Sequence, residues 1–362
     1  MEPFKNLVNP GSIARIGAML ATTGPFDLEG FVAESARDLD PLELKARVRH
    51  VATVLRRHLP ADWPSAMRQV VAALPPAPVA DDALSAGLFL WPLAQLVEDH
   101  GLEFPALSLC AMRAITPHAS AEFAVRPYLV RHPAAAWAAV DEWSRDSNMH
   151  VRRLASEGTR PRLPWGQRLH ASIADPSRGL RVIDRLVDDP SAYVRRSVAN
   201  HLGDVAKDHP RLAVDVARGW LPGRRRLVEH ALRDLLKKGD GGALALLGQG
   251  GAVAVEAVRV EPSAAAVGGR VRVLARLSGE GTVRADVVWQ WPGARGWSAK
   301  TFRGAVRELA AGEAWSFETT LDLRPVTTRP VRLGEQRVFL RVNGADHGPV
   351  SFVLLDAGPS RE

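Results

Sequence analysis

Apolar residues in the first two thirds of the chain recur with helical spacing. In the range Pro41–Leu59 the apolar side chains fall mainly on one face and Arg and Lys residues lie elsewhere. Helix starts are marked by Asp, Ser or Pro, as in Asp175-Pro176, because these residues suit the first turn of a helix. Strand-like alternation is absent from this part of the chain. We therefore predict an α-helical domain over residues 1–247.

The predicted helices repeat in pairs. The segment Val151–Glu157 (VRRLASE) aligns with Val194–Asn200 (VRRSVAN) at an offset of 43 residues, and VEHALRD at 228–234 follows at an offset of 34. The dipeptides that precede these segments share the two offsets: His132-Pro133, Asp175-Pro176 and His209-Pro210. Helix pairs with a period near 40 residues are typical of HEAT-like repeats, which stack into a curved solenoid. Chance similarity between helices is the alternative, and the shared VRR favours the repeats.

A different pattern begins after Gly248–Gly251. The remaining segments are short, often alternate between apolar and polar residues, and are separated by Gly, Pro and Ser clusters. The predicted strands are Val253–Val260, Gly269–Leu277, Thr282–Trp291, Trp315–Leu323 and Arg337–Val342. We predict an immunoglobulin-like β-sandwich over residues 252–357, although in the absence of cysteine pairs the sandwich type rests on strand count alone. The expected fold class is thus multidomain, with an α-helical repeat solenoid followed by a small β domain.

Composition excludes several classes of protein. The chain has 362 residues, enough for two or three domains, and its one cysteine, Cys110, rules out an internal disulfide and any Cys-rich zinc site. The longest uncharged stretch, Ala83–Val97, is shorter than the roughly 20 residues that span a bilayer. The N-terminus lacks the apolar core of a secretory signal. These features predict a cytoplasmic protein that does not insert into membranes.

Positive charge is concentrated in one part of the chain. The formal net charge is +7, and the stretch Arg145–Lys238 holds 20 basic and 11 acidic residues. Arginine supplies nearly all of the excess, because the chain has six lysines, and the guanidinium fork binds phosphate oxygens in pairs. A GC-rich genome is an alternative cause of the arginine enrichment. Its clustering is the electrostatic pattern expected of a nucleic-acid-binding protein.

Common cofactor motifs are missing. The chain has no Walker A loop, no HExxH and no GxSxG, and the GQGG at 248–251 is better explained as a linker than as a dinucleotide loop. Three histidines of the basic region, His201, His209 and His230, do not have zinc-ligand spacing. We therefore expect neither a metal ion nor an organic cofactor.

Glu157 is the first candidate for chemistry, because it is an acid among Arg152, Arg153 and Arg160. A carboxylate in a phosphate-binding groove repels DNA and therefore needs a function. The alternative is a surface glutamate that pairs with these arginines on neighbouring helical turns. The repeat alignment places Asn200 and Asp234 at the equivalent position of the next two units.

Two further candidates flank this region. Glu122 is placed at the start of the helix that precedes the first clear repeat, where an acid could simply favour the helix dipole. Trp165 follows Leu163-Pro164 and is therefore expected on a rigid turn, with a core tryptophan as the alternative.

Several long segments of the chain resemble the AlkC branch of the AlkC/AlkD DNA alkylation repair glycosylases, and together they cover nearly its whole length. In the helical part these are NPGSIARIGAML (9–20), FDLEGF (26–31), ELKARVRHVATVLRRHLP (43–60), SAEFAVRPYLVRHP (120–133), HVRRLASEGTRPRLPW (150–165) and SAYVRRSVANHLGDVAKDHP (191–210). In the β domain they are LRPVTTR (323–329) and VNG (342–344).

The resemblance implies a HEAT-like enzyme of base excision repair that excises positively charged alkylated bases, chiefly 3-methyladenine and 3-methylcytosine, from duplex DNA without base flipping. By motif it assigns Glu122, Glu157 and Trp165 to a catalytic site facing the deoxyribose of the lesion. It also implies that the β domain helps to grip DNA.

The chemistry of such a lesion agrees with these residue types. A ring-alkylated base already carries positive charge, so it is a good leaving group that needs no strong general acid. A carboxylate near the sugar stabilises the oxocarbenium charge that develops as the base departs, and a carboxylate can also orient the attacking water. An indole beside the sugar favours the same cation. An open solenoid is not expected to hold a pocket of the kind that receives a flipped base.

Basic and polar residues in the matched segments are candidates for contacts with the DNA backbone, which would set the position of the duplex without reading its sequence. They are Arg126, Arg152, Arg153, Arg160, Arg195, Arg196, Asn200 and Lys207, with Lys300 and Arg329 of the β domain as weaker candidates. No lysine lies within residues 122–165, so strand cleavage through a lysine nucleophile is not expected.

We therefore expect a monomeric, monofunctional N-glycosylase that acts on alkylated double-stranded DNA at the bacterial nucleoid. Two alternatives remain open from the residues alone. One is a DNA-binding repeat protein without catalysis, and the other is a protein-interaction scaffold, which is the commoner use of HEAT solenoids.

Overall fold

The computed structural model describes residues 4–77, 87–325 and 332–356. These residues form two compact units, divided between Asp208 and His209. The predicted change from helices to strands occurs where expected, because the last helix ends at Leu246 and the first strand begins at Val253. The units divide earlier, however, because the second unit begins at His209 and includes the last four helices together with the β domain.

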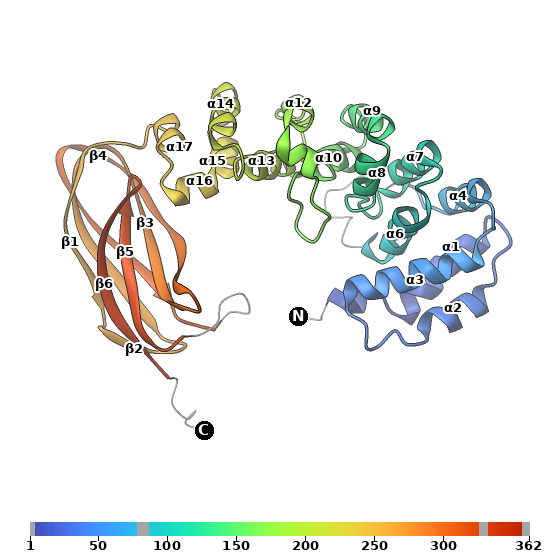
Figure 1. Cartoon of the computed structure of the whole chain (residues 1–362), viewed down its shortest axis with the longest axis horizontal. Coiled ribbons are helices and arrows are strands. Elements are labelled where there is room, and N and C mark those ends of the chain that lie inside the picture. Colours follow the sequence, from blue (N-terminus) through green and yellow to red (C-terminus); the bar gives the residue numbers. More distant parts are fainter. Residues whose placement is uncertain (1–3, 78–86, 326–331, 357–362) are drawn as a thin grey trace. The chain divides into compact units, whose positions relative to one another are not determined.

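The first unit is a stack of short helices (Figure 1). Its elements are η1 (Phe4–Leu7), α1 (Pro10–Ala21), α2 (Leu28–Ala36), α3 (Leu44–His58), α4 (Trp63–Ala72), η2 (Leu88–Leu90), α6 (Trp91–His100), α7 (Pro105–Ile115), α8 (Val125–Arg131), α9 (Pro133–Trp143), α10 (Met149–Glu157), α11 (His170–Ala174), α12 (Ser177–Arg185) and α13 (Ala192–Val205).

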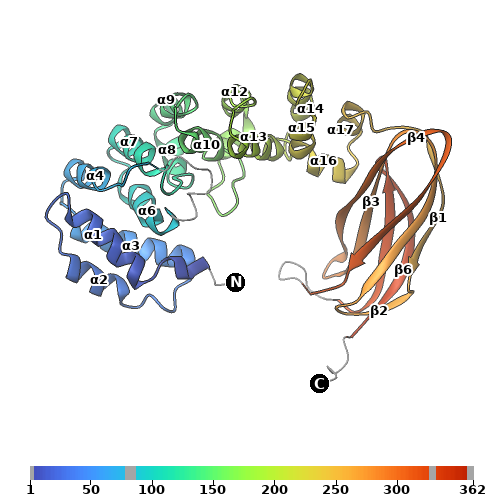
Figure 2. The same cartoon turned by 180° about the vertical axis from the view of Figure 1, so that it is seen from behind.

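The predicted repeats are helix pairs in this stack. The first is α9 with α10 and the second is α12 with α13, and each pair places its VRR segment on the second helix. In Figure 1, α7, α9 and α12 form one row and α6, α8, α10 and α13 form the other, and Figure 2 shows the same two rows from behind. Buried Val151 and Leu154 of α10 and Val194 and Val198 of α13 supply apolar surface between the second helices. The fold class is therefore the predicted helical repeat.

One predicted helix start is wrong. The helix expected from Pro41 begins at Leu44, with Glu43 as its N-cap. The cause is buried Arg47, whose guanidinium donates to the carbonyl oxygens of Leu42 at 2.9 Å and Asp40 at 3.1 Å. These carbonyl groups are satisfied by a side chain, so residues 40–42 need not be helical.

The second unit begins with helices α14 (Pro210–Trp220), α15 (Arg225–Ala231), α16 (Arg233–Lys238) and α17 (Gly241–Leu246). The third predicted repeat is the pair α14 and α15. Its VEHALRD segment is divided between α15 and α16 at Leu232, so this copy departs from the unbroken second helices of the other two.

The β domain follows with β1 (Val253–Glu261), β2 (Ala264–Ala266), β3 (Arg270–Gly293), β4 (Gly296–Asp322), β5 (Gly334–Val342) and β6 (Ala345–Leu355). The first half of β3 pairs with β1, and the second half pairs with β5, while β4 follows β3 along its whole length. The core between these strands contains Val273, Trp289, Phe317, Leu340 and Phe352.

Two predicted strands are one. The ranges Gly269–Leu277 and Thr282–Trp291 both belong to β3, and the pairing of β3 with β4 changes register between them, at Gly279 and Gly281. Gly281 has a φ of 89°, which a residue with a side chain rarely adopts. The glycines that resemble a turn in the sequence therefore form a bulge that bends one long strand. The pattern also missed β2, β6 and residues 296–314 of β4, whose side chains are mostly exposed.

Within the second unit, the helices and the β domain meet at two glycines. A Cβ atom on Gly239, at the end of α16, would lie 2.6 Å from the Cα atom of Gly344. Beside this contact, Arg341 Nη1 donates to the carbonyl oxygen of Lys237 at 2.7 Å. The backbones approach so closely that a side chain has no space at residue 239.

Gly239→Ala is therefore expected to lower the free energy of unfolding by about 2–4 kcal/mol, from a left-handed backbone with φ 79° and from overpacking. The matched control is Gly223→Ala, which has a similar φ of 75° but open space around it. This control should lower the free energy of unfolding only through the strain of its left-handed backbone, by about 1–2 kcal/mol. Urea denaturation measures both, and equal losses would contradict this account of the junction.

Candidate active site

The three predicted catalytic residues line one cleft of the first unit. It has a volume of about 360 Å³, whereas the sequence predicted no obvious pocket in an open solenoid. Glu122 and Glu157 supply its acidic part, and Arg160 lies beside them. The rest of the lining is mostly apolar and includes Leu88, Trp91, Phe123, Leu163, Pro164 and Trp165.

Glu157 is the last residue of α10, and its side chain is 6 % exposed. The Asn148 side chain caps the start of this helix by accepting from the backbone N–H of His150 at 2.8 Å. Both carboxylate oxygens are bound. Oε1 accepts from Arg160 Nη1 at 2.6 Å and lies 3.5 Å from Arg153 Nη2, and Oε2 accepts from Ser197 Oγ at 2.6 Å.

These partners keep Glu157 ionised. Burial by itself raises the pKa of a carboxyl, but the charges of Arg153 and Arg160, together with the Ser197 hydrogen bond, outweigh it and lower the pKa of Glu157 below its usual value. The alternative of a surface glutamate is therefore wrong about exposure, although it named two of the correct arginine partners.

Glu122 lies in a turn that precedes α8 and not in the helix itself, which begins at Val125. Its Oε2 atom accepts from Ser120 Oγ at 2.9 Å and from Arg153 Nη1. Arg153 therefore joins the two candidate carboxylates. Its guanidinium also lies over the ring of Tyr193, 5.1 Å from the ring centre.

The pairs continue away from the cleft. Arg160 Nε donates to Asp204 Oδ2 at 2.8 Å, and Lys207 Nζ donates to Asp204 Oδ1 at 2.8 Å. We call this series the ion-pair chain, which alternates in sign and sums to zero: Glu122, Arg153, Glu157, Arg160, Asp204 and Lys207.

Sequence reasoning missed Asp204, which is 1 % exposed. A signal was present on α13, because Ser197, His201 and Asp204 are four and three residues apart and so share one face of the helix. All three side chains are buried; Ser197 and His201 contact α10, and Asp204 contacts Arg160, which lies just beyond that helix. A polar stripe on the buried face of a helix marks a hydrogen-bonded network, since buried polar groups need partners.

Trp165 stands at the rim of the cleft. Its φ of 63° is in the left-handed region, and its side chain is 74 % exposed, so the alternative of a core tryptophan is wrong. Lys45 of α3 fixes this turn, because Lys45 Nζ donates to the Trp165 carbonyl oxygen at 2.8 Å and lies 4.8 Å from the centre of the Phe123 ring. An exposed indole held in a strained conformation is typical of a binding site.

The prediction that Arg126 contacts the DNA backbone is wrong. Arg126 is completely buried, so its guanidinium cannot contact DNA in this structure. Instead, Nη1 donates to the Gly158 carbonyl oxygen at 2.8 Å and Nε to that of Gln167 at 2.6 Å. Burial lowers the pKa of Arg126 to about 10. The side chain thereby ties the end of α10 to the turn that carries Trp165.

Other predicted DNA contacts are also engaged within the protein. Arg153 and Arg160 bind the carboxylates described above, and both guanidinium groups lie mostly out of solvent. Arg152 makes two hydrogen bonds with Asp189, at 2.6 and 3.0 Å. Arg195 donates to the carbonyl oxygens of Asp189 and Pro190.

The remaining candidates are more accessible. Arg196 and Lys300 are exposed, Lys207 is partly exposed beside Asp204, and Asn200 is half-buried. Arg329 lies outside the described residues.

His201 completes the support behind Glu157. Its Nδ1 atom lies 3.0 Å from the Ser156 carbonyl oxygen, while Nε2 is buried against Gly179 without a hydrogen-bond partner among the described residues. The ring is therefore neutral, with its proton on Nδ1. Burial lowers the pKa of His201 to about 4, although Asp204 and Glu157 oppose the shift.

Stability is expected to fall as pH falls from 7 to 5. The unfolded chain binds a proton at His201 near pH 6.5, and the folded protein does so only near pH 4, so folding is opposed between these values. The loss is about 2 kcal/mol by pH 5. His201→Asn keeps a donor toward Ser156 without a titrating ring, and it should remove this component. Urea titrations at both pH values measure it, and an unchanged pH dependence in the variant would refute it.

Two kinds of feature are absent from the described residues. None of their helices is long and apolar enough to span a membrane. No group of three or more His, Cys, Asp or Glu side chains in this part of the chain is arranged to hold a metal ion.

Comparison with known proteins gives a consistent result. Residues 47–215 match the family described as DNA alkylation repair enzyme, and residues 254–356 match the C-terminal immunoglobulin-like domain of YhaZ. The uncharacterised protein YhaZ of Bacillus subtilis is 34% identical over 87% of this chain and 88% of its own length.

A solved structure is also similar over the whole molecule. It is the alkylpurine DNA glycosylase AlkC of Pseudomonas fluorescens, bound to DNA that contains an abasic site analogue. The match covers 98% of this chain and 100% of that one, with 32% identity and a TM-score of 0.89. This chain therefore belongs to the DNA alkylation repair enzyme family, in its AlkC branch.

Proposed function

We propose that this protein is a monofunctional DNA N-glycosylase that removes positively charged alkylated bases, including 3-methyladenine and 3-methylcytosine, from duplex DNA as the first step of base excision repair. The observation that carries the proposal is the pair Glu122 and Glu157, joined by Arg153 in a cleft with Trp165 at its rim. The similar AlkC is an alkylpurine glycosylase whose structure contains DNA, which supports the same reaction and partner for this chain.

The reaction requires one bond to break and one to form. The bond between C1′ of the deoxyribose and the base nitrogen breaks, and its electron pair neutralises the cationic base. The sugar then carries oxocarbenium charge until water adds at C1′ and gives up a proton. Carboxylates and aromatic faces both attract positive charge, so the cleft suits this transition state.

The two carboxylates differ in how many of their oxygen atoms already accept hydrogen bonds within the protein. Both oxygens of Glu157 are bound to partners, so it acts as a fixed negative charge beside the sugar. The hydrogen bonds that Glu122 accepts from described residues go to Oε2. Its other oxygen is placed to accept a hydrogen bond from the attacking water, so we assign water orientation to Glu122.

Trp165 is assigned a place against the deoxyribose of the lesion. Its exposure leaves the indole available to a ligand, whereas the charged side chains that line the cleft are held in ion pairs. This arrangement favours approach to the sugar from outside the base stack, without flipping. Fluorescence of 2-aminopurine beside a lesion analogue tests that point, since an extruded base brightens its neighbour and a stacked one does not.

Lys45 donates to the Trp165 carbonyl oxygen at the rim of the cleft, although no lysine lies within residues 122–165 of the sequence. Its ammonium group is occupied by the Trp165 carbonyl oxygen and the Phe123 ring, which favours a positioning role over a nucleophilic one. Action on the bacterial nucleoid in the cytoplasm, a monomeric state and independence of metals and cofactors stay predictions.

Glu157→Gln is expected to lower single-turnover release of 3-methyladenine by about 10²–10³-fold, because it removes the fixed charge and keeps the shape. Affinity for undamaged duplex should change little, since the side chain faces the cleft interior. Chromatography of released bases from methylated DNA measures the rate, and exposed Glu142→Gln of α9 is the control. Release at the wild-type rate would refute the assignment, and no release by the wild type would favour a non-catalytic DNA-binding protein.

Trp165→Ala is expected to lower the same rate about tenfold through loss of a cation–π contact, and Trp165→Phe should retain most of it. Because the indole is 74 % exposed, the thermal stability of the alanine variant should be close to that of the wild type. A normal rate in the alanine variant would exclude Trp165 from the site.

A further inference from the structure

A second cavity lies in the other unit, where helices α15 and α16 meet strands β3 and β4. Its volume is about 430 Å³, within the range of ligand-binding sites. Basic side chains dominate its lining, which consists of Arg226, Glu229, His230, Arg233, Leu236, Lys237, Gln249, Arg284, Arg303 and Val306.

Some of these charges are neutralised. Glu229 pairs with Arg225 at 3.1 Å, and buried Arg284 donates to Asp286 Oδ2 at 2.7 Å. Each of these two ion pairs has no net charge and contributes to the wall of the cavity. Four other cations of the lining have no carboxylate within salt-bridge distance among the described residues: Arg226, Arg233, Lys237 and Arg303.

Arg303 is placed in the cavity by an irregularity of the sheet. The register of β3 and β4 shifts between Ala285 and Val287, opposite Arg303 and Gly304. A Cβ atom on Gly304 would lie 2.1 Å from the Ala285 carbonyl oxygen, so only glycine fits there. The Gly304 N–H donates to Asp286 Oδ1 at 3.0 Å, which holds the bulge in place. Such bulges re-aim side chains beside functional sites.

The other side of the cavity is also held rigidly. Lys237 lies in the last turn of α16, and Arg341 binds its carbonyl oxygen. Gln249 is 2 % exposed, and its backbone N–H donates to the Leu244 carbonyl oxygen at 2.8 Å. Its side-chain oxygen is buried with no donor among the described residues. A buried acceptor of this kind requires a hydrogen-bond donor, which a water molecule can supply.

We propose that this cavity is an anion site that binds phosphate groups. Clustered cations without carboxylate partners repel one another, and a phosphate removes that repulsion while it accepts several charge-assisted hydrogen bonds. The phosphate has two sources of the same chemistry. It is either a backbone phosphate of bound DNA, in which case the site extends the proposed function, or the phosphate of a free small molecule such as a nucleotide.

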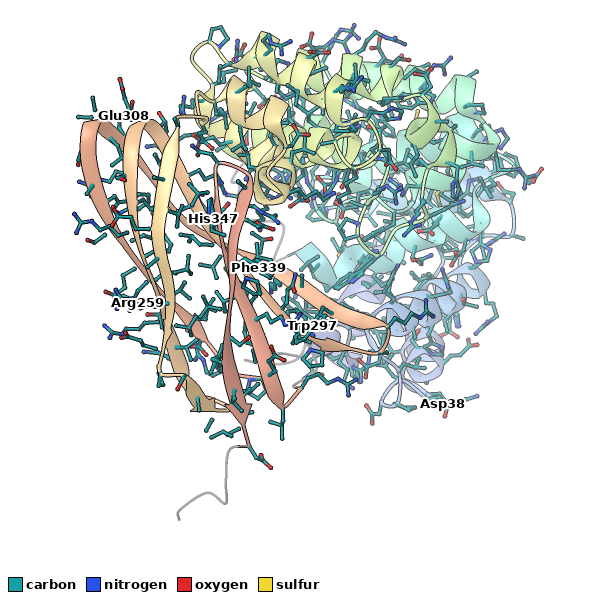
Figure 3. All side chains as sticks on the ribbon, turned by 60° about the vertical axis from the view of Figure 1, so that its left-hand side comes forward. Asp38, Arg259, Trp297, Glu308, Phe339 and His347 are labelled. Atoms are coloured by element: carbon teal, nitrogen blue, oxygen red, sulfur yellow. The ribbon has the colours of Figure 1, made fainter. Side chains whose placement is uncertain are left out.

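The test removes two positive charges from the cavity of the full-length protein. The variant is Arg226→Gln with Arg303→Gln. The matched control is Arg259→Gln with Arg276→Gln, which removes two exposed arginines of β1 and β3 that do not line the cavity. Arg259 lies on the outer side of the β domain (Figure 3). Circular dichroism and melting temperature verify that both variants fold.

Two titrations are made with each protein. One measures anisotropy of a fluorescent undamaged duplex at several salt concentrations, and the other measures heat of binding of inorganic pyrophosphate. Loss of duplex affinity by at least tenfold in the cavity variant only, with the slope of log affinity against log salt reduced by about 1 for each phosphate released, identifies a DNA phosphate. Unchanged duplex affinity with loss of pyrophosphate binding identifies a free phosphate ligand.

The proposal is overturned if the cavity and control variants match in both titrations, or if the wild type binds neither probe. Failure of the anion-site proposal can be distinguished from failure of the proposed glycosylase function, because neither titration depends on base release. A wild type that binds pyrophosphate but neither binds duplex nor releases bases would retain the anion site and lose the glycosylase.

Discussion

Glu157 is almost completely buried and still ionised, and the candidate active site depends on the two arginines that make this possible. Moving an unpaired carboxylate out of water costs so much that the group would take up a proton instead. Arg153 and Arg160 prevent that, and each is itself shared with a second acid, Glu122 or Asp204. Removing one member therefore leaves a buried charge unpaired, which is strongly destabilising.

These ion pairs change how the basic region, residues 145–238, is interpreted. Its arginine excess resembles a phosphate-binding surface, yet much of it is used inside the protein. Arg152 and Arg160 bind carboxylates, and Arg195 binds backbone carbonyl oxygens. Outside this region, Arg47 and Arg126 also bind backbone carbonyl oxygens. The planar guanidinium suits these tasks because it donates several hydrogen bonds in fixed directions. Exposed cations such as Arg196 remain available for the proposed contacts with the DNA backbone, and they are fewer than the charge count indicates.

In the second unit, arginine side chains and glycines again fix contacts between segments that are distant in the sequence. At the junction of α16 with the β domain, Gly239 and Gly344 let two backbones touch, and Arg341 secures the contact. The bulge at Gly304 then turns Arg303 toward the helices. Close backbone approach and a bulge both follow from glycine, which the sequence displays without showing what each glycine contacts.

The sequence by itself determined the helical repeats, the change to strands near residue 250, and the identity of Glu122, Glu157 and Trp165 as a group worth testing. These follow from local periodicity, from offsets between repeats, and from motifs that are contiguous in the chain. Tertiary structure alone decided which charges are paired. Asp204 lies 44 residues from Arg160 and Lys45 lies 120 residues from Trp165, so no local pattern could reveal either contact. Arginine was the least predictable residue, because its long side chain serves DNA, carboxylates and backbone oxygens equally well, and only burial and the position of its partners distinguish these uses.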